Sequence, residues 1–283
     1  MPIRLIAVDI DGTLLDSLGQ IPVVNQDAIH EALDANIDIV LVTGRTFHHA
    51  QPVADALSGR LVLILNNGAL VKRTTGETMD QRLLDCEIAR KVITATRSVR
   101  EGAALIFDRS DNRQYLFERI DWRHPNRCQY YERHRRFMTE VDALEDMLAE
   151  PPAQVAFNGS LADMRRLDAY LRALPIAPHV TITRTEYAAR NFTLLDVTAR
   201  GCSKGAALLA WTTTCGVDRS EIMAVGDNLN DREMLEFAAW PVVMGNAVPE
   251  LKTRGWPITR GHDEGGLAEA IRSVALLSLD RHV

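Results

Sequence analysis

Residues 4–15 read RLIAVDIDGTLL, a short apolar run that ends in two acidic residues and a glycine. Such a run is typical of a strand that is buried on both faces of a sheet. Two more runs follow, IDIVLV at residues 37–42 and LVLIL at residues 61–65. Stretches with helical spacing, residues 25–35 and 47–57, separate the three runs. The alternation predicts an α/β fold with a parallel sheet and right-handed crossovers.

The pattern changes in the middle of the chain and returns after residue 202. Short strands paired with single helices predict a separate α+β domain there. We therefore expect a Rossmann-like core, residues 1–82 and 192–283, interrupted by an inserted domain, residues 83–191. Between residues 83 and 202 we expect a hairpin of residues 103–108 and 114–117, strands at 153–158, 180–183 and 192–197, and a helix at 161–174. After it we expect helices at 204–211, 231–239 and 267–279, and strands at 222–225 and 241–244.

Length and composition limit the possible classes of protein. The chain has 283 residues, which suggests about two domains, and 46% of its residues are hydrophobic, enough to build their cores. The formal charge of −6 argues against a nucleic-acid-binding protein. The longest apolar runs fall far short of the ~20 residues that span a bilayer, and we read no signal peptide at the N-terminus. The four cysteines show no CxxC spacing, so we expect no disulfide framework and a cytoplasmic protein.

The first chemically suggestive segment is Asp9-Ile10-Asp11-Gly12-Thr13-Leu14, at the end of the first predicted strand. Two carboxylates at this spacing could bind a hard cation such as Mg²⁺. One could also attack phosphorus while the other transfers protons. Alternatively, both are solvated acids of a loop.

Three further polar segments follow predicted strands or begin predicted helices. Thr43-Gly44-Arg45 could hold a phosphate oxygen, or could be an ordinary turn that begins a helix. Lys204 in Ser203-Lys204-Gly205 could contribute to an anion site, or could be solvated. The loop of residues 226–231, with sequence GDNLND, could complete a cation site or could cap the next helix.

Together and in this order, the segments resemble the motif set of haloacid dehalogenase superfamily phosphatases. These motifs are Asp-x-Asp-Gly-Thr-Leu, Thr-Gly-Arg, Lys-Gly and Gly-Asp-x-x-Asn-Asp. The Ser-Lys-Gly triplet, the late Gly-Asp-Asn-x-Asn-Asp and the position of the insert resemble the Cof-like, type IIB branch. The resemblance covers essentially the whole chain. It implies that the insert is a C2-type cap domain and that the enzyme hydrolyses small phosphorylated metabolites with Mg²⁺ as cofactor.

The resemblance also implies a role for each matching residue. Asp9 would be the nucleophile that forms an aspartyl-phosphate, and Asp11 would protonate the leaving oxygen and then activate water. Thr43 and Lys204 would hold the transferring phosphoryl group. Mg²⁺ would be bound by Asp9, the main-chain carbonyl of Asp11, Asp227 and Asp231. The other substrate-binding positions would be Ile10, Gly12, Gly44, Asn67, Gly68 and Asn230.

One departure concerns residues 262–266, HDEGG, where family members often show an Asn and then Asp-Gly before the last helix. It puts a secondary loop contact in question. We expect His262 to be a loop histidine, because Asp11 already fills the role of the base.

The predicted insert contains a basic and aromatic segment, residues 119–137. It could form a positive wall for an anionic substrate, or a solvated surface with the aromatic rings packed beneath it.

Two rival functions remain open: a phosphotransferase or phosphomutase that uses the same aspartyl-phosphate, and a non-catalytic regulator that binds a phosphorylated ligand. We expect a small phosphorylated metabolite as partner, no nucleic acid, no membrane, and a monomer or homodimer.

Overall fold

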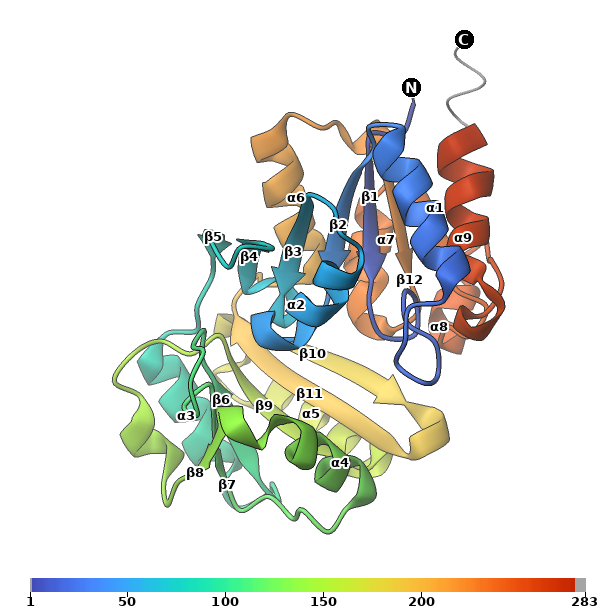
Figure 1. Cartoon of the computed structure of the whole chain (residues 1–283). Helices are drawn as coiled ribbons and strands as arrows, with labels where there is room; N and C mark the ends of the chain where they lie inside the picture. The colour runs from blue at the N-terminus through green and yellow to red at the C-terminus, as the bar shows by residue number, and fades with distance from the viewer. Residues whose placement is uncertain (1, 278–283) are drawn as a thin grey trace. The chain divides into compact units, whose positions relative to one another are not determined.

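A computed structural model describes residues 2–277, apart from the side chains of Asn126, Gln129 and Arg133. The chain forms two compact units (Figure 1). One unit, the core, contains the residues up to Gln81 and those from Ser203 onward, and the other, the insert, is Arg82–Cys202. This confirms the expected class, an α/β core interrupted by an inserted α+β domain.

The core is built on a seven-stranded sheet in the order β13-β12-β1-β2-β3-β4-β5. The first five strands in that order are parallel, and at one edge β4 runs antiparallel to both of its neighbours, β3 and β5. All five residues of β1 are buried, as expected of a strand covered on both faces. The strands are β1 (Leu5–Asp9), β2 (Asp38–Val42), β3 (Leu61–Leu65), β4 (Leu70–Arg73), β5 (Thr78–Gln81), β12 (Ile222–Gly226) and β13 (Trp240–Val243).

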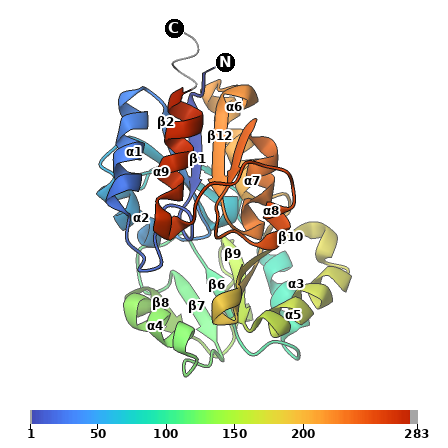
Figure 2. The same cartoon turned by 90° about the vertical axis from the view of Figure 1, so that its right-hand side faces the viewer.

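Helices cover both faces of the core sheet (Figures 1 and 2). The helices α6 (Lys204–Cys215) and α7 (Arg232–Phe237) share one buried cluster with the side chains of Ala7 and Val42. On the other face, α1 (Val23–Asp34) packs beside α9 (Gly266–Ala270). The remaining core helices are α2 (Phe47–Ala56) and α8 (Pro249–Lys252).

The insert contains a six-stranded sheet in the order β10-β11-β9-β6-β7-β8, antiparallel except for the pair β7 and β8. The helices α3 (Cys86–Thr96) and α5 (Leu161–Ala173) contribute to its large hydrophobic cluster, which includes Phe157. Its other elements are β6 (Ala103–Ile106), β7 (Tyr115–Glu118), α4 (Pro125–His134), β8 (Met138–Glu140), β9 (Gln154–Gly159), β10 (Val180–Tyr187) and β11 (Phe192–Ala199). The expected hairpin is therefore β6 and β7.

The second boundary between the units differs from the expected one. We expected the core to resume at residue 192, but β11 pairs along its length with β10 and β9 of the insert. The core resumes only at Ser203, after a turn at Gly201. The apolar pattern of β11 is compatible with either sheet, so local sequence does not reveal which partner strands it has.

Two other differences concern the edges of the core. The sequence did not predict β4 and β5, and all four residues of β5 are exposed, so that strand carries no buried apolar pattern. The expected final helix, residues 267–279, is the α-helix α9 followed by a π-helical stretch, Ile271–Leu276. Residues 278 and 279 lie outside the described part of the chain.

The aromatic residues of the basic segment 119–137 pack together. The ring of Trp122 lies 5.0 Å from that of Phe117 and 4.6 Å from that of Tyr131. Arg127 is buried and donates to the side chain and carbonyl of Asn158. These contacts agree with the interpretation of packed rings beneath a polar surface.

Within residues 2–277, no helix combines the length and the apolar character needed to cross a bilayer.

Candidate active site

The predicted chemical residues gather at one edge of the core sheet. Asp9 ends β1, Thr43 follows β2, and Asp227 follows β12. These strands are parallel, so their carboxyl ends meet at the same edge, where open α/β sheets place their sites. Lys204 is the first residue of α6, and the side chain of Ser203 caps this helix by accepting a hydrogen bond from the N–H of Ala206.

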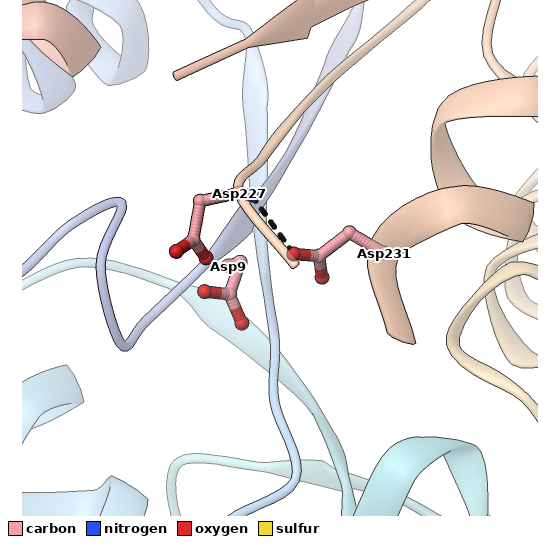
Figure 3. A group of neighbouring side chains, drawn as sticks. All are labelled: Asp9, Asp227 and Asp231. Carbon is pink, nitrogen blue, oxygen red and sulfur yellow. Dashed lines mark hydrogen bonds between the residues drawn. The ribbon is translucent and has the colours of Figure 1, made fainter. Parts of the chain in front are cut away.

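Three buried carboxylates lie together at this edge: Asp9, Asp227 and Asp231 (Figure 3). Each offers an oxygen atom, and the three oxygens lie within 4.8 Å of one another. One oxygen of Asp231 accepts hydrogen bonds of 2.9 Å from the main-chain N–H groups of Asp227 and Asn228. The short turn after β12 therefore holds the Asp231 carboxylate in place.

Lys204 supplies a positive charge inside this group. Its Nζ atom lies 2.6 Å from Oδ1 of Asp9 and 2.6 Å from Oδ1 of Asp231, and its side chain is 1% exposed. Burial opposes the charge of the lysine, but the carboxylates of Asp231 and Asp9 outweigh burial and raise its pKa. Lys204 is therefore a fixed cation.

One cation does not balance three carboxylates. Burial and the neighbouring Asp231 raise the pKa of Asp9 to about 8, against the opposing effect of Lys204. Burial and the charge of Asp9 raise the pKa of Asp227 well above its ordinary value. Buried carboxylates of like charge favour protonation unless a cation offsets them. With all three carboxylates ionised beside Lys204, the site would carry an excess of negative charge that one divalent cation would neutralise.

The donor atoms present fit a Mg²⁺ ion. Oδ1 of Asp227 is buried and has no hydrogen-bond partner among the described residues. An unpaired buried carboxylate oxygen is costly unless something else binds it. Mg²⁺ is a hard cation that prefers carboxylate oxygens, so the Asp9, Asp227 and Asp231 group is a suitable binding set.

The side chain of Asp11 lies outside this carboxylate group. Its two oxygens face Arg45, with Nη2 at 2.6 Å from Oδ1 and Nε at 2.8 Å from Oδ2. The expected contact of Asp11 with a metal is through its main-chain carbonyl, which stays a prediction. Arg45 belongs to the Thr-Gly-Arg motif, and sequence reasoning assigned it no separate role.

The loop after β1 passes close over Asp227, and this explains Gly12. The residue has a φ of +86°, and a Cβ atom there would lie 2.5 Å from Oδ2 of Asp227. A side chain at position 12 would therefore collide with a member of the carboxylate group. Ile10 is buried in the same loop. The proposed donation by the N–H groups of Ile10 and Gly12 to a phosphate stays a prediction.

The predicted phosphate-binding residues also meet at this edge. Asn230 Nδ2 donates to Oδ1 of Asn67 at 3.0 Å, and the side chain of Asn67 lies beside Gly44. The N–H of Asn67 donates to the carbonyl of Thr43. The residue Thr43 is buried, with 2% of its surface exposed. The structure thus brings the residues after β2, β3 and β12 into contact.

Gly68 makes the contact between the β3 loop and α6 possible. It has a φ of +99°, and a Cβ atom there would lie 2.2 Å from the carbonyl oxygen of Ser203, far below any real contact distance. The close approach of these two backbones places the loop of Asn67 next to the helix that carries Lys204. No residue other than glycine fits both requirements.

Sequence reasoning missed Asn246, which follows the last parallel strand, β13. Its Nδ2 atom donates to the carbonyl of Gly12 at 2.9 Å and to Oδ2 of Asp227 at 3.4 Å. A polar residue at the end of a parallel strand was the available signal. Its Oδ1 atom accepts from the N–H of His262, and Oδ1 of Asp263 accepts from the N–H of Ser17. The divergent 262–266 segment therefore still supports the loop after β1.

Comparison with known proteins identifies the family. Residues 6–271 match the family of haloacid dehalogenase-like hydrolases. The chain belongs to this family. The phosphatase YwpJ of Bacillus subtilis is 28% identical over 95% of this chain and 99% of its own length. The HMP-PP phosphatase of Serratia proteamaculans is 28% identical over 88% of this chain and 86% of its own length.

A solved structure with the same fold is that of BT4131, a sugar phosphatase of haloacid dehalogenase subclass IIB. It matches with a TM-score of 0.79 at 22% identity and covers 95% of this chain and 98% of that chain. The family match confirms the resemblance to the haloacid dehalogenase hydrolases, the named relatives support the assignment of the chain as a phosphatase, and the solved structure confirms the fold.

Proposed function

We propose that this phosphatase depends on Mg²⁺ and hydrolyses phosphate monoesters of small metabolites, such as sugar phosphates, through an aspartyl-phosphate on Asp9. The observation that carries the proposal is the buried Asp9 carboxylate, held by Lys204 and adjacent to the unpaired oxygen of Asp227. This arrangement combines a nucleophile, a fixed cation and a set of metal ligands in one place.

Asp9, Asp227, Asp231 and the main-chain carbonyl of Asp11 would hold the metal ion. When bound, Mg²⁺ would offset the repulsion between the carboxylates and a phosphoryl dianion and keep Asp9 ionised. Lys204 adds a second positive charge that is already fixed by Asp9 and Asp231. A charge that needs no reorganisation stabilises the transition state more than a mobile one.

In the first step, a carboxylate oxygen of Asp9 bonds to phosphorus as the bond from phosphorus to the ester oxygen breaks. The leaving oxygen takes a proton from Asp11, so that the product departs as a neutral alcohol. Thr43, Gly44, Lys204 and Asn230, with the main chain of Ile10 and Gly12, would hold the phosphoryl oxygens. Asn67 and Gly68 would line the floor of the site through their contacts with Asn230 and Ser203.

In the second step, water attacks the phosphorus of the aspartyl-phosphate. Asp11 takes a proton from that water, and the bond between phosphorus and Asp9 breaks. The step returns Asp9 as a carboxylate and releases inorganic phosphate. Both steps use the same two residues in alternating roles.

The substrate class rests on the relatives. BT4131 is described as a sugar phosphatase, and the relative from Serratia proteamaculans is named an HMP-PP phosphatase. We propose that this chain likewise takes a small phosphorylated metabolite, and that it acts in the cytoplasm without a nucleic-acid or membrane partner. The acidic composition and the cysteine spacing support this last part.

The experiment is phosphate release from a panel of sugar phosphates, HMP-PP and p-nitrophenyl phosphate. Wild type, Asp9→Asn and the surface control Asp55→Asn are compared in EDTA and in excess Mg²⁺. We expect release by wild type and the control in Mg²⁺ alone, and none by Asp9→Asn. A separate readout is the thermal midpoint, which Mg²⁺ should raise for wild type and leave unchanged for Asp227→Asn.

Release in EDTA, or turnover by Asp9→Asn, would contradict the proposal. Consumption of the ester that requires an added sugar, and that yields a new sugar phosphate in place of free phosphate, would instead identify a phosphotransferase. A folded wild-type protein that binds these compounds without turning them over would identify a regulator.

A further inference from the structure

Arg45 binds the Asp11 carboxylate through two hydrogen bonds, one to each oxygen. Nε donates to Oδ2 at 2.8 Å and Nη2 donates to Oδ1 at 2.6 Å. A guanidinium group that engages both oxygens fixes the plane of a carboxylate as well as its position. A lysine would make a single contact and would leave the carboxylate free to rotate.

Arg45 is itself held from two directions. Its Nη1 atom donates to the carbonyl of His49, in the first turn of α2, at 3.1 Å, and its main-chain N–H donates to Oγ1 of Thr43 at 3.1 Å. The guanidinium group therefore lies at the junction of β2 and α2. The ion pair connects this junction to the loop after β1, 34 positions earlier in the chain.

The pair is unlike a stabilising contact of the core. The side chains of Arg45 and Asp11 are 28% and 40% exposed, and solvent screens ion pairs that are exposed to this extent. The carboxylates of Asp9, Asp227 and Asp231, in contrast, are buried as one group. Asp11 is thus kept apart from the group that could bind a metal, yet its direction is fixed.

We propose that Arg45 is a positioning residue that aims the Asp11 carboxyl group at the leaving oxygen of the substrate. The inference rests on the proposed function, in which Asp11 gives its proton to that oxygen as the ester bond breaks and regains one from water. Each carboxyl oxygen accepts from Arg45 through one lone pair, and the carboxyl group keeps others that can carry the transferred proton. Arg45 holds Asp11 and does not itself exchange the proton.

The test compares esters whose leaving groups differ in their need for a proton. The p-nitrophenolate ion departs unaided, whereas the alkoxide of a sugar phosphate needs protonation. We expect Arg45→Met to lower kcat/KM by about 100-fold for the alkyl ester and by less than about fivefold for p-nitrophenyl phosphate. This parameter reports the step in which the ester bond breaks, so slow release of phosphate does not obscure the difference.

Three further variants sharpen the test. Arg45→Lys should recover part of the loss on the alkyl ester, and the exposed Arg60→Met should match wild type on both esters. In the Asp11→Asn background, Arg45→Met should cause no further loss, because the residue acts through Asp11. Thermal unfolding of each variant checks that the core is intact.

Equal losses on the two esters would overturn the inference and indicate contact with the phosphoryl group or a structural role. So would losses that add up in the double variant, or faster turnover by Arg45→Met, which would indicate a restraint that must be released. If wild type releases no phosphate from either ester, the proposed function itself fails and the inference fails with it.

Discussion

At the scale of single residues, the buried triad of Asp9, Asp231 and Lys204 contributes both to the stability of the core and to the proposed chemistry. Lys204 lies 2.6 Å from both carboxylates and is buried with them. Removing one partner of a buried ion pair leaves an uncompensated charge, and this lowers the free energy of unfolding more than the loss of an exposed pair does. The triad therefore links the stability of the core to its chemistry.

The first prediction concerns Lys204→Met. It removes the charge that faces the transferring phosphoryl group, so kcat should fall by about 100-fold or more. It should also lower the free energy of unfolding by about 3–5 kcal/mol at pH 8 in EDTA. Enzyme kinetics and urea unfolding measure the two effects. Wild-type kinetics in this variant would show that Lys204 has no role in catalysis.

The second prediction concerns pH in the absence of metal. Burial raises the pKa of Asp9 from 3.8 to about 8. Between pH 3.8 and about pH 8, the Asp9 carboxyl group therefore holds a proton in the folded protein but has lost it in the unfolded chain. The resulting stabilisation is complete below pH 3.8 and is lost as the pH rises through about 8. The free energy of unfolding in EDTA should therefore fall with rising pH, by up to about 1.4 kcal/mol per pH unit for this proton.

Urea unfolding between pH 5 and pH 8 measures this slope. Excess Mg²⁺ should flatten it, because a bound cation stabilises the ionised carboxylate. Asp9→Asn should also reduce the slope. A wild-type slope that is the same with and without Mg²⁺ would contradict the assignment of this group as the metal site.

At the scale of elements, loops after strands bring the site together, and close backbone contacts fix them. The β3 loop meets the first turn of α6 at Gly68 and Ser203. The turn after β12 holds Asp231 through the main-chain N–H groups of Asp227 and Asn228. The helix α6 itself begins after a serine cap and ends at Cys215, before the capping residue Gly216, which has a φ of +64°.

The third prediction compares two glycines. Gly68→Ala should destabilise the protein by about 2–4 kcal/mol, because a Cβ atom would collide with the carbonyl of Ser203 at a positive φ. Gly216→Ala also has a positive φ but has open space around it, so it should lose about 1 kcal/mol. Urea unfolding measures both. Equal losses would mean that the contact between the loop and α6 is not tight.

The strands and motifs that form the site were easier to predict from the sequence than the long-range contacts between them. The apolar runs that became β1, β2, β3 and β12 and the motifs after them were evident from the sequence. Residues whose role depends on distant partners were not. Arg45 donates hydrogen bonds to the Asp11 carboxylate, and Asn246 donates one to the carbonyl of Gly12. No local sequence pattern reveals either contact. The sheet to which β11 belongs was missed for the same reason, because pairing with β9 and β10 is not encoded within the strand.

At the scale of the whole molecule, the described residues of the core and of the insert each form a large hydrophobic cluster of their own. One contains Leu5 and Leu208 in the core, and the other contains Leu105 and Phe157 in the insert. Each unit has its own sheet and its own buried side chains, so each is expected to unfold cooperatively. The carboxylate group belongs to the core alone.

The fourth prediction follows from this division. Scanning calorimetry should resolve two transitions, and Mg²⁺ should raise the temperature of only one of them. At a concentration 100 times its dissociation constant, the ion should add about 2.7 kcal/mol to the stability of the core. Asp227→Asn should abolish the shift. A Mg²⁺ shift of both transitions, or one that persists in Asp227→Asn, would place the ion elsewhere.

The central claim is that Asp9 becomes covalently phosphorylated, and acid quenching of a single turnover tests it most directly. The measurement uses the Asp11→Asn variant with Mg²⁺ and p-nitrophenyl phosphate, because loss of the base slows the breakdown of the intermediate. Peptide mass spectrometry should then find one added phosphoryl group, on Asp9. Release of p-nitrophenol by this variant with no phosphoryl group on Asp9, or with one on another residue, would contradict the proposed mechanism.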